Sequence, residues 1–202
     1  RLYHTNLTGD WEIFRLDSAD EATRQTAHIN LSHGEGPDVT DMAPSRSPNA
    51  EWIIFSSNRD GNWELYVAPT DGDESKIQRV TYNTVALDTD PAWGPHNFVV
   101  FESTRDGNWE LYLIDMSDGH EYRLTDNEAS DINPIWSPDG TRIAFQSDRD
   151  GFWQIYEIDL VNRSVKRLSD GNGIDVDPAY APDGQHIAFR SYRDGSQNSV
   201  LY

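Results

Sequence analysis

The chain of 202 residues carries 16 Lys and Arg against 35 Asp and Glu, a formal net charge of −19, and it contains no cysteine. The lack of cysteine excludes a disulfide framework and any zinc or iron-sulfur site ligated by thiolates. The negative charge repels phosphate backbones, so we expect no nucleic-acid partner, and there is no run of about 18 apolar residues to span a membrane. Hydrophobic residues at 36% can build a core, which excludes a disordered acidic tail.

The first 40 residues hold a faint copy of a pattern that becomes clear later in the chain. The start at Arg1, with neither Met nor a signal-like apolar stretch, predicts a processed mature chain or an excised fragment. RLYHT (1–5) is expected to be a strand, and Trp11 opens the next one. The segment 18–38 departs from the pattern. It holds His28 and His33 near Glu35 and Asp38, and we expect a polar surface loop there rather than a metal or acid-base site.

Three clear copies of one sequence follow: SSNRDGNWELYVAPTDG (56–72), STRDGNWELYLIDMSDG (103–119) and SDRDGFWQIYEIDLVN (147–162). The arginines of the repeated RDG, at positions 59, 105, 149 and 193, are 46, 44 and 44 residues apart. A period of about 44 residues is typical of the four-stranded blades of a β-propeller. We therefore predict an all-β propeller.

The copy from 132 onward shows how one period divides. It predicts strands at 132–137, 141–147, 153–159 and 165–169, because these runs alternate apolar and polar residues and are rich in Ile, Tyr, Phe and Trp. Asp-Gly pairs such as 139–140 and 150–151 supply the positive φ that tight connections need. No sustained 3.6-residue period occurs, so we expect no substantial helix.

The chain is expected to begin in the second strand of one blade and to end, at SVLY (199–202), in the third strand of another. This gives three full blades and two partial ones in a single domain over 1–202, with repeats at approximately 1–41, 42–88, 89–131, 132–175 and 176–202. The chain therefore looks like an incomplete propeller, either cut from a longer protein or completed by another chain. Open strand edges expose unpaired backbone N–H and C=O groups that can pair with another chain, so self-association is expected.

One family carries the same signature. The residues SPDG at 137–140, IAF at 143–145, RDG at 149–151, Ile155-Tyr156 and Arg167-Leu168 recur over most of the chain, followed by D-x-x-P. This pattern resembles the TolB-like β-propeller repeat, a relative of the WD repeat found mainly in bacterial exported proteins. The resemblance implies a periplasmic or extracellular setting and protein partners. It is specific for the fold and weak for any one function, because similar blades also occur in serine peptidases and polysaccharide lyases.

The candidate binding residues lie in two kinds of turn that a meandering blade brings to one face. Each RDG arginine can form two charge-assisted bonds with an aspartate of a D-x-x-P turn. Their equal recurrence favours a role in fastening the blades, with binding of a cation or a basic peptide as the alternative. The candidates are Arg59, Asp60, Asp88, Asp90, Arg105, Asp106, Asp131, Arg149, Asp150, Asp175, Asp177, Arg193 and Asp194, and Asp41 occupies the equivalent position of the second repeat.

Other signals are weaker. Asp90 and Asp177 place a second carboxylate one residue before the proline, and such oxygen-rich loops suit calcium as an alternative. No EF-hand series occurs, however, so we expect no cofactor. Trp93, Trp136 and Tyr180, and the tryptophans at 11, 63, 109 and 153, are expected to pack between blades, with sugar or peptide platforms as the alternative for the second set. No nucleophile elbow, H-E-x-x-H motif or phosphate-cradling loop occurs, and we expect no enzyme activity.

Together these features predict a non-catalytic scaffold that binds a protein with a basic surface through the acidic RDG-bearing face. Two alternatives remain open. One is that the chain is the propeller portion of a larger hydrolase or lyase whose catalytic centre lies elsewhere. The other is that it is a structural protein that assembles through open strand edges.

Overall fold

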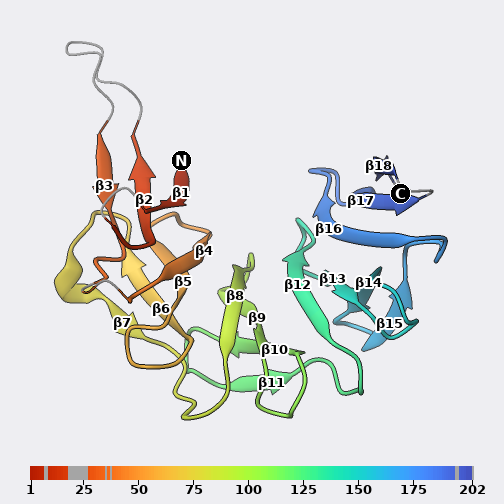
Figure 1. The fold of residues 1–202 in the computed structure, drawn as a ribbon, viewed down its shortest axis with the longest axis horizontal. Helices are drawn as coiled ribbons and strands as arrows, with labels where there is room; N and C mark the ends of the chain where they lie inside the picture. The colour runs from red at the N-terminus through yellow and green to blue at the C-terminus, as the bar shows by residue number, and fades with distance from the viewer. Residues whose placement is uncertain (7–8, 18–26, 35, 37, 194–195, 202) are drawn as a thin grey trace. The chain divides into compact units, whose positions relative to one another are not determined.

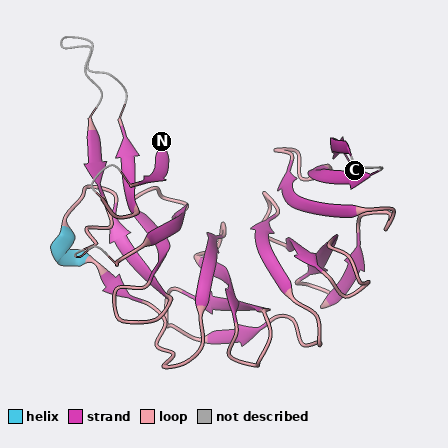
Figure 2. Ribbon diagram, viewed as in Figure 1, coloured by secondary structure: helices cyan, strands magenta, loops and turns pink. Residues whose placement is uncertain are grey.

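The computed structural model describes residues 1–6, 9–17, 27–34, 36, 38–193 and 196–201. They form two compact units, Arg1–Pro91 and Ala92–Tyr202. Regular structure in the described residues is β-strand apart from one 3-10 turn, Glu74–Lys76 (Figure 2). Within those residues, the prediction that the chain has no substantial helix is confirmed.

The strands are short and follow one another closely. Those that begin in the first unit are β1 (Leu2–Thr5), β2 (Glu12–Leu16), β3 (His28–Asn30), β4 (Asp41–Arg46), β5 (Trp52–Ser57), β6 (Glu64–Pro69), β7 (Gln78–Arg79) and β8 (Asp88–Trp93). Those of the second unit are β9 (Phe98–Ser103), β10 (Glu110–Asp115), β11 (Glu121–Arg123), β12 (Asp131–Trp136), β13 (Arg142–Ser147), β14 (Gln154–Asp159), β15 (Ser164–Arg167), β16 (Ile174–Tyr180), β17 (Ile187–Arg193) and β18 (Ser196–Leu201).

Each sheet is a meander in which consecutive strands are neighbours (Figure 1). The sheet orders are β1-β2-β3, β4-β5-β6-β7, β11-β10-β9-β8, β12-β13-β14-β15 and β16-β17-β18. The predicted strand succession, three strands, then three sets of four, then three, is therefore observed. The predicted strand ranges of the fourth sheet agree with the structure to within two residues.

The first strands of the second, fourth and fifth sheets contain a β-bulge at the same place. The register shifts between Met42 and Ser45 in β4, between Ile132 and Ile135 in β12, and between Val176 and Ala179 in β16. The residue before the proline adopts a positive φ in each of these strands and in β8, although none of the four is glycine: Ala43 (51°), Asp90 (49°), Asn133 (56°) and Asp177 (53°). The left-handed conformation costs a residue with a Cβ free energy, and a bulge re-aims side chains and stops regular pairing.

The hydrophobic cores lie between adjacent sheets. In the first unit, Ile13 and Leu31 of the first sheet pack with Ile53, Phe55 and Tyr66 of the second. In the second unit, one cluster joins the third and fourth sheets and another joins the fourth and fifth. Trp136 belongs to the former, and its indole lies so close to Gly94 that a Cβ there would come within 2.4 Å of the ring. The predicted packing of Trp136 between blades is thus confirmed.

Asp139 organises the turn that connects β12 and β13. Its Oδ1 accepts hydrogen bonds from the Ser137 hydroxyl (2.7 Å), the Thr141 amide (3.0 Å) and the Thr141 hydroxyl (2.8 Å). These bonds favour the ionised carboxylate and lower the pKa of Asp139 to about 2.

We expect this carboxylate to stabilise the fold in a pH-dependent way. A pKa lowered by folding contributes stability that is complete above the unfolded value of about 3.9 and is lost as the pH falls towards 2. NMR titration of the intact chain should place the Asp139 midpoint near 2, and Asp139→Asn should remove its share of the pH dependence. A midpoint near the ordinary value for an aspartate would contradict the assignment of these bonds.

Candidate functional site

The RDG turns of the second, third and fourth sheets lie at one end of the sheet, between its second and third strands. We call this the RDG end; it comprises residues 58–61, 104–107 and 148–151 and the end of β17 at 192–193. The same end carries the start of the first strand, because Asp41 is the register partner of Ser57, and Asp131 that of Ser147. The glycines at 61, 107 and 151 take φ values of 98°, 100° and 86°, as the tight turn requires.

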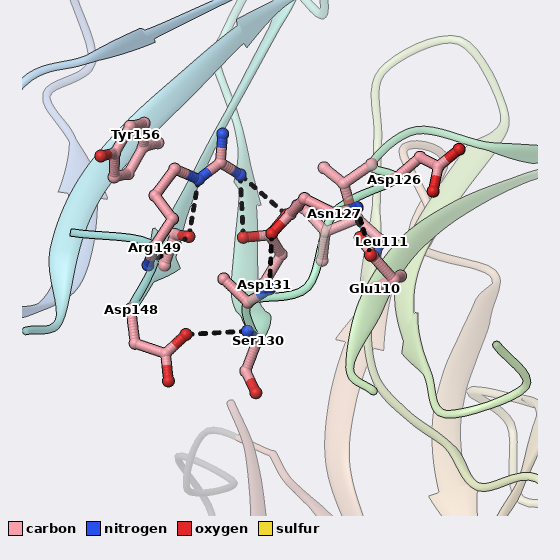
Figure 3. Close-up of polar contacts among 12 residues, drawn as sticks. Glu110, Leu111, Asp126, Asn127, Ser130, Asp131, Asp148, Arg149 and Tyr156 are labelled. Atoms are coloured by element: carbon pink, nitrogen blue, oxygen red, sulfur yellow. Dashed lines mark hydrogen bonds and ion pairs between the residues drawn. The ribbon is translucent and has the colours of Figure 1, made fainter. Parts of the chain in front are cut away.

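The arginine of the fourth sheet shows the full set of contacts (Figure 3). Nη2 of Arg149 donates to both oxygens of Asp131, at 2.9 and 2.8 Å, and Nε donates to the Ser147 hydroxyl at 2.8 Å. The guanidinium lies over the ring of Tyr156, 4.5 Å from its centroid, which adds a cation-π contact. Asp131 also accepts from the side-chain amide of Asn127 at 2.7 Å.

Arg59 repeats this arrangement in the first unit. It donates to both oxygens of Asp41 at 3.1 Å and to the Ser57 hydroxyl at 2.9 Å, and it lies over Tyr66. It also donates to the backbone carbonyl of Ser32, which belongs to the preceding sheet, at 2.8 Å. The predicted pairing of an RDG arginine with an aspartate of the D-x-x-P turn is therefore observed in both units.

The other two arginines keep the contact with serine and each pair with a further acidic residue. Arg105 donates to Ser103 at 2.8 Å and pairs with Glu121. Arg193 donates to Ser191 at 2.8 Å and to both oxygens of Asp170 at 2.9 Å, while its Nη2 lies 3.8 Å from Asp175. Asp170 and Glu121 are partners that the sequence pattern did not single out.

The aspartates that begin the first strands are buried and hydrogen-bonded within the fold. Asp41, Asp88, Asp131 and Asp175 are fully buried. Their backbone amides donate to the carbonyl oxygens of Trp11, Trp63, Trp109 and Trp153 respectively, in the preceding sheets, at 2.7 to 3.0 Å. These contacts agree with the fastening role that the equal recurrence favoured, and they leave Asp88, Asp131 and Asp175 no surface to offer a partner.

The aspartates of the RDG turns are the accessible ones. Asp60, Asp106 and Asp150 each accept a hydrogen bond from a tyrosine of the following strand and pair with an arginine of the fourth strand. The Tyr156 hydroxyl and then Arg167 lower the pKa of Asp150, whereas burial and this carboxylate raise the pKa of Tyr156 to about 12. Asp150 therefore stays ionised at neutral pH with 42% of its side chain exposed. Asp194 lies outside the described residues.

Asp177 lies in the bulge of β16, and Asp90 takes the corresponding positive φ in β8. Burial raises the pKa of Asp90, and its amide donates to the Ser56 hydroxyl at 3.0 Å. Asp177 accepts from Arg190 and from the side-chain amide of Asn133. In the part of the chain that the structure describes, no three His, Asp or Glu side chains come together to hold a metal ion.

The two histidines of the diverged segment do not share a site. The His28 ring contacts the Tyr3 hydroxyl, while Nδ1 of His33 lies 3.5 Å from Glu74. Glu35 is outside the described residues, and the backbone carbonyl of Asp38 accepts from Asn58 at 3.1 Å. The expected polar surface loop is wrong for the described part of this segment, because His28–Asn30 form strand β3 and Leu31 is buried in the core of the first unit.

Sequence reasoning missed three exposed apolar residues at the RDG end of the second unit. Phe152, Ile174 and Tyr192 are 61%, 40% and 39% exposed, and Ile174 is the register partner of Tyr192. Phe152 stands where the other copies have Asn62 and Asn108, whose side-chain amides bond to backbone carbonyls of the adjoining loop. This departure from the repeat was the available signal.

The antiparallel four-stranded sheets, joined by recurring polar contacts at one end, define a β-propeller built from sequence-repeated blades. The family model of the TolB β-propeller domain matches residues 21–129, 91–169 and 132–200, and the chain belongs to this family. The predicted fold class and family are thereby confirmed.

Solved structures of other proteins share this fold. TolB of Acinetobacter baumannii has a TM-score of 0.77 at 23% identity and covers 99% of this chain, which spans 48% of that protein. A putative TolB of Agrobacterium tumefaciens has a TM-score of 0.77 at 24% identity. It covers 100% of this chain, which spans 72% of that protein. A puromycin-hydrolyzing peptidase of Mycobacterium tuberculosis shares the fold at a TM-score of 0.72 and 16% identity, over 100% of this chain and 36% of the peptidase.

Among curated proteins, an uncharacterized protein of Agrobacterium fabrum is 29% identical over 149 residues, which make up 66% of this chain and 47% of the relative. The chain thus spans about half the length of this relative and of the Acinetobacter TolB. Among the described residues, no helix has the length and apolar character that a membrane crossing requires.

Proposed function

We propose that this chain is a non-catalytic binding scaffold that acts outside the cytoplasm and docks a protein partner at the RDG end of its second unit. The observation that supports this most directly is the exposure of the large apolar side chains Phe152, Ile174 and Tyr192 at this end of the unit. Exposed apolar groups with a polar rim are typical of protein interaction sites, where aromatic residues supply most of the binding energy.

The rim of this surface favours a partner with basic residues. Asp150 and Asp170 are ionised carboxylates with about half of each side chain exposed, next to Arg167 and Arg193. The formal net charge of −19 adds a long-range attraction for cations. The partner that fits is therefore a protein segment with an apolar anchor flanked by Lys or Arg. Membership of a family found mainly in exported proteins supports a periplasmic or extracellular location.

Peptide display tests the proposal. Random peptides selected on the immobilised chain are expected to combine an apolar anchor with Lys or Arg. Phe152→Ser should weaken their binding by about tenfold or more, since one interface aromatic contributes roughly 2 kcal/mol. Affinity should also fall as salt rises.

Val161→Ser is the matched control. Val161 is 76% exposed and lies beyond the opposite end of β14, so its replacement should leave binding unchanged. Peptides that bind equally to the wild type and to Phe152→Ser, or whose affinity does not respond to salt, would contradict the proposal.

A second candidate is that the chain is the propeller portion of a larger hydrolase. The resemblance in fold to the puromycin-hydrolyzing peptidase, of which this chain would span about a third, favours considering it. The full reading frame decides between the two: an adjoining α/β-hydrolase segment with a nucleophile elbow would support the hydrolase.

A further inference from the structure

A second surface feature of the chain is a cavity between the third and fourth sheets, within the second unit. Its volume is about 490 Å³, in the range of small-molecule sites. Leu113 of β10 and Ile158 of β14 line it. Both residues lie near the ends of their strands, away from the RDG turns that precede these strands. The cavity is therefore separate from the surface proposed to bind protein.

The walls of the cavity are mainly apolar. Leu113, Leu124, Ile158 and Leu160 line it together with the ring of Trp136. That ring is fixed, because its indole N–H donates to the Ala92 carbonyl at 2.9 Å and its face packs on Gly94. Tyr122 and Val165, also in the lining, are 47% and 43% exposed. Apolar groups held open in this way gain free energy when a ligand covers them.

Two basic side chains, Arg163 and His96, also line the cavity without an acidic partner in the described part of the chain. Arg163 has no carboxylate within ion-pair distance there, whereas the nearby Arg142 and Arg167 are paired with Glu157 and Asp150. Arg123, the other arginine of the lining, is neutralised by Glu110 and Asp126.

The turn that carries Arg163 places this charge at an energetic cost. The corresponding turn of the third sheet has Gly119 at φ 76°, whereas Arg163 adopts φ 54°. The left-handed region favours glycine, so an arginine here is strained relative to its counterpart. The Asp159 carboxylate holds the turn by accepting from the amides of Val161 and Asn162, both at 2.9 Å.

We propose that this cavity binds a small amphiphilic monocarboxylate. The apolar body lies against Trp136, Leu113 and Ile158, and the carboxylate pairs with the Arg163 guanidinium, while His96, also in the lining, supplies a second donor. Arg163 and His96 are exposed, so the guanidinium is hydrated in the free chain, attracts an anion to this cavity and repels a cation. A carboxylate satisfies both parts of the lining.

Calorimetric titration of the intact chain with decanoate and 1-naphthoate, an aliphatic and an aromatic monocarboxylate, tests the proposal. At least one of them should bind saturably with one site per chain and should shift the NMR signal of the Trp136 indole N–H. Arg163→Gly should weaken the binding by about tenfold or more, because a charge-assisted hydrogen bond is lost. The variant should fold, since glycine occupies the same position in the third sheet. Decanol, which lacks the charge, should bind the wild type and Arg163→Gly equally weakly.

Lys166→Gln is the control for a general effect of charge. Lys166 lies in the same strand as Val165, pairs with Glu157 at 3.0 Å and does not line this cavity. Its replacement should change the affinity less than twofold. The proposal is overturned if neither carboxylate binds saturably, if decanol binds the wild type as tightly as the carboxylates do, or if Arg163→Gly and Lys166→Gln weaken binding equally.

Discussion

Replacing Phe145 with alanine is expected to lower the free energy of unfolding by about 3–5 kcal/mol, the usual cost of emptying a buried phenylalanine site. Phe145 is fully buried in the cluster that joins the third and fourth sheets, and its ring centroid lies 5.8 Å from that of Tyr156. The guanidinium of Arg149 lies 5.6 Å from the centroid of the Phe145 ring. The cavity left by Phe145→Ala would therefore remove support from both the core and the RDG end. Urea unfolding followed by tryptophan fluorescence measures the change.

Phe152→Ala is the matched control for this prediction. Phe152 is the same residue type in the same sheet but is 61% exposed, so its removal should change the free energy of unfolding by no more than about 0.5 kcal/mol. Equal losses in the two variants would show that the burial assigned to them is wrong.

Asp131→Ala is expected to lower the free energy of unfolding by about 3 kcal/mol or more. Removal of one partner from a buried ion pair leaves the other charge without its counterion. Here the Arg149 guanidinium loses two hydrogen bonds of 2.9 and 2.8 Å, and the Asn127 amide loses one of 2.7 Å (Figure 3). Double replacement with Arg149→Met should cost less than the sum of the two single changes, because no charge is then stranded.

Asp126→Ala provides the comparison for Asp131→Ala. Asp126 pairs with Arg123 at 3.0 Å, but 83% of its side chain is exposed, and exposed ion pairs contribute about 1 kcal/mol or less. A loss for Asp131→Ala no larger than that for Asp126→Ala would mean that the buried aspartates do not fasten the blades.

The aspartates at the RDG end fall into two sets that differ in burial. Asp131 is an example of the fully buried aspartates: its carboxylate pairs with Arg149, and its backbone amide donates to the Trp109 carbonyl of the adjacent sheet. The half-exposed ones, such as Asp150, are oriented by a tyrosine hydroxyl and an arginine yet remain open to solvent. The first set holds adjacent sheets together, and the second set is the one that the proposed docking of a partner would use.

The sequence by itself determined the strands and their order. The expected strand 141–147 is observed at Arg142–Ser147, and the expected strand 153–159 at Gln154–Asp159. These features are local, because alternation of apolar and polar residues and the positive φ of an Asp-Gly turn depend on near neighbours along the chain. Period and motif also determined the family, because each blade repeats the same local solution.

Only the tertiary structure decided which polar and apolar residues face solvent. Asp131 and Asp150 both belong to turns at the same end of one sheet, yet Asp131 is fully buried and Asp150 is half exposed. The difference arises from residues distant in sequence: the Trp109 carbonyl and the Arg149 guanidinium enclose Asp131. The cavity beside Arg163 likewise needs two sheets to form it. Burial is a property of packed neighbours, and the spacing of residues along one chain does not specify it.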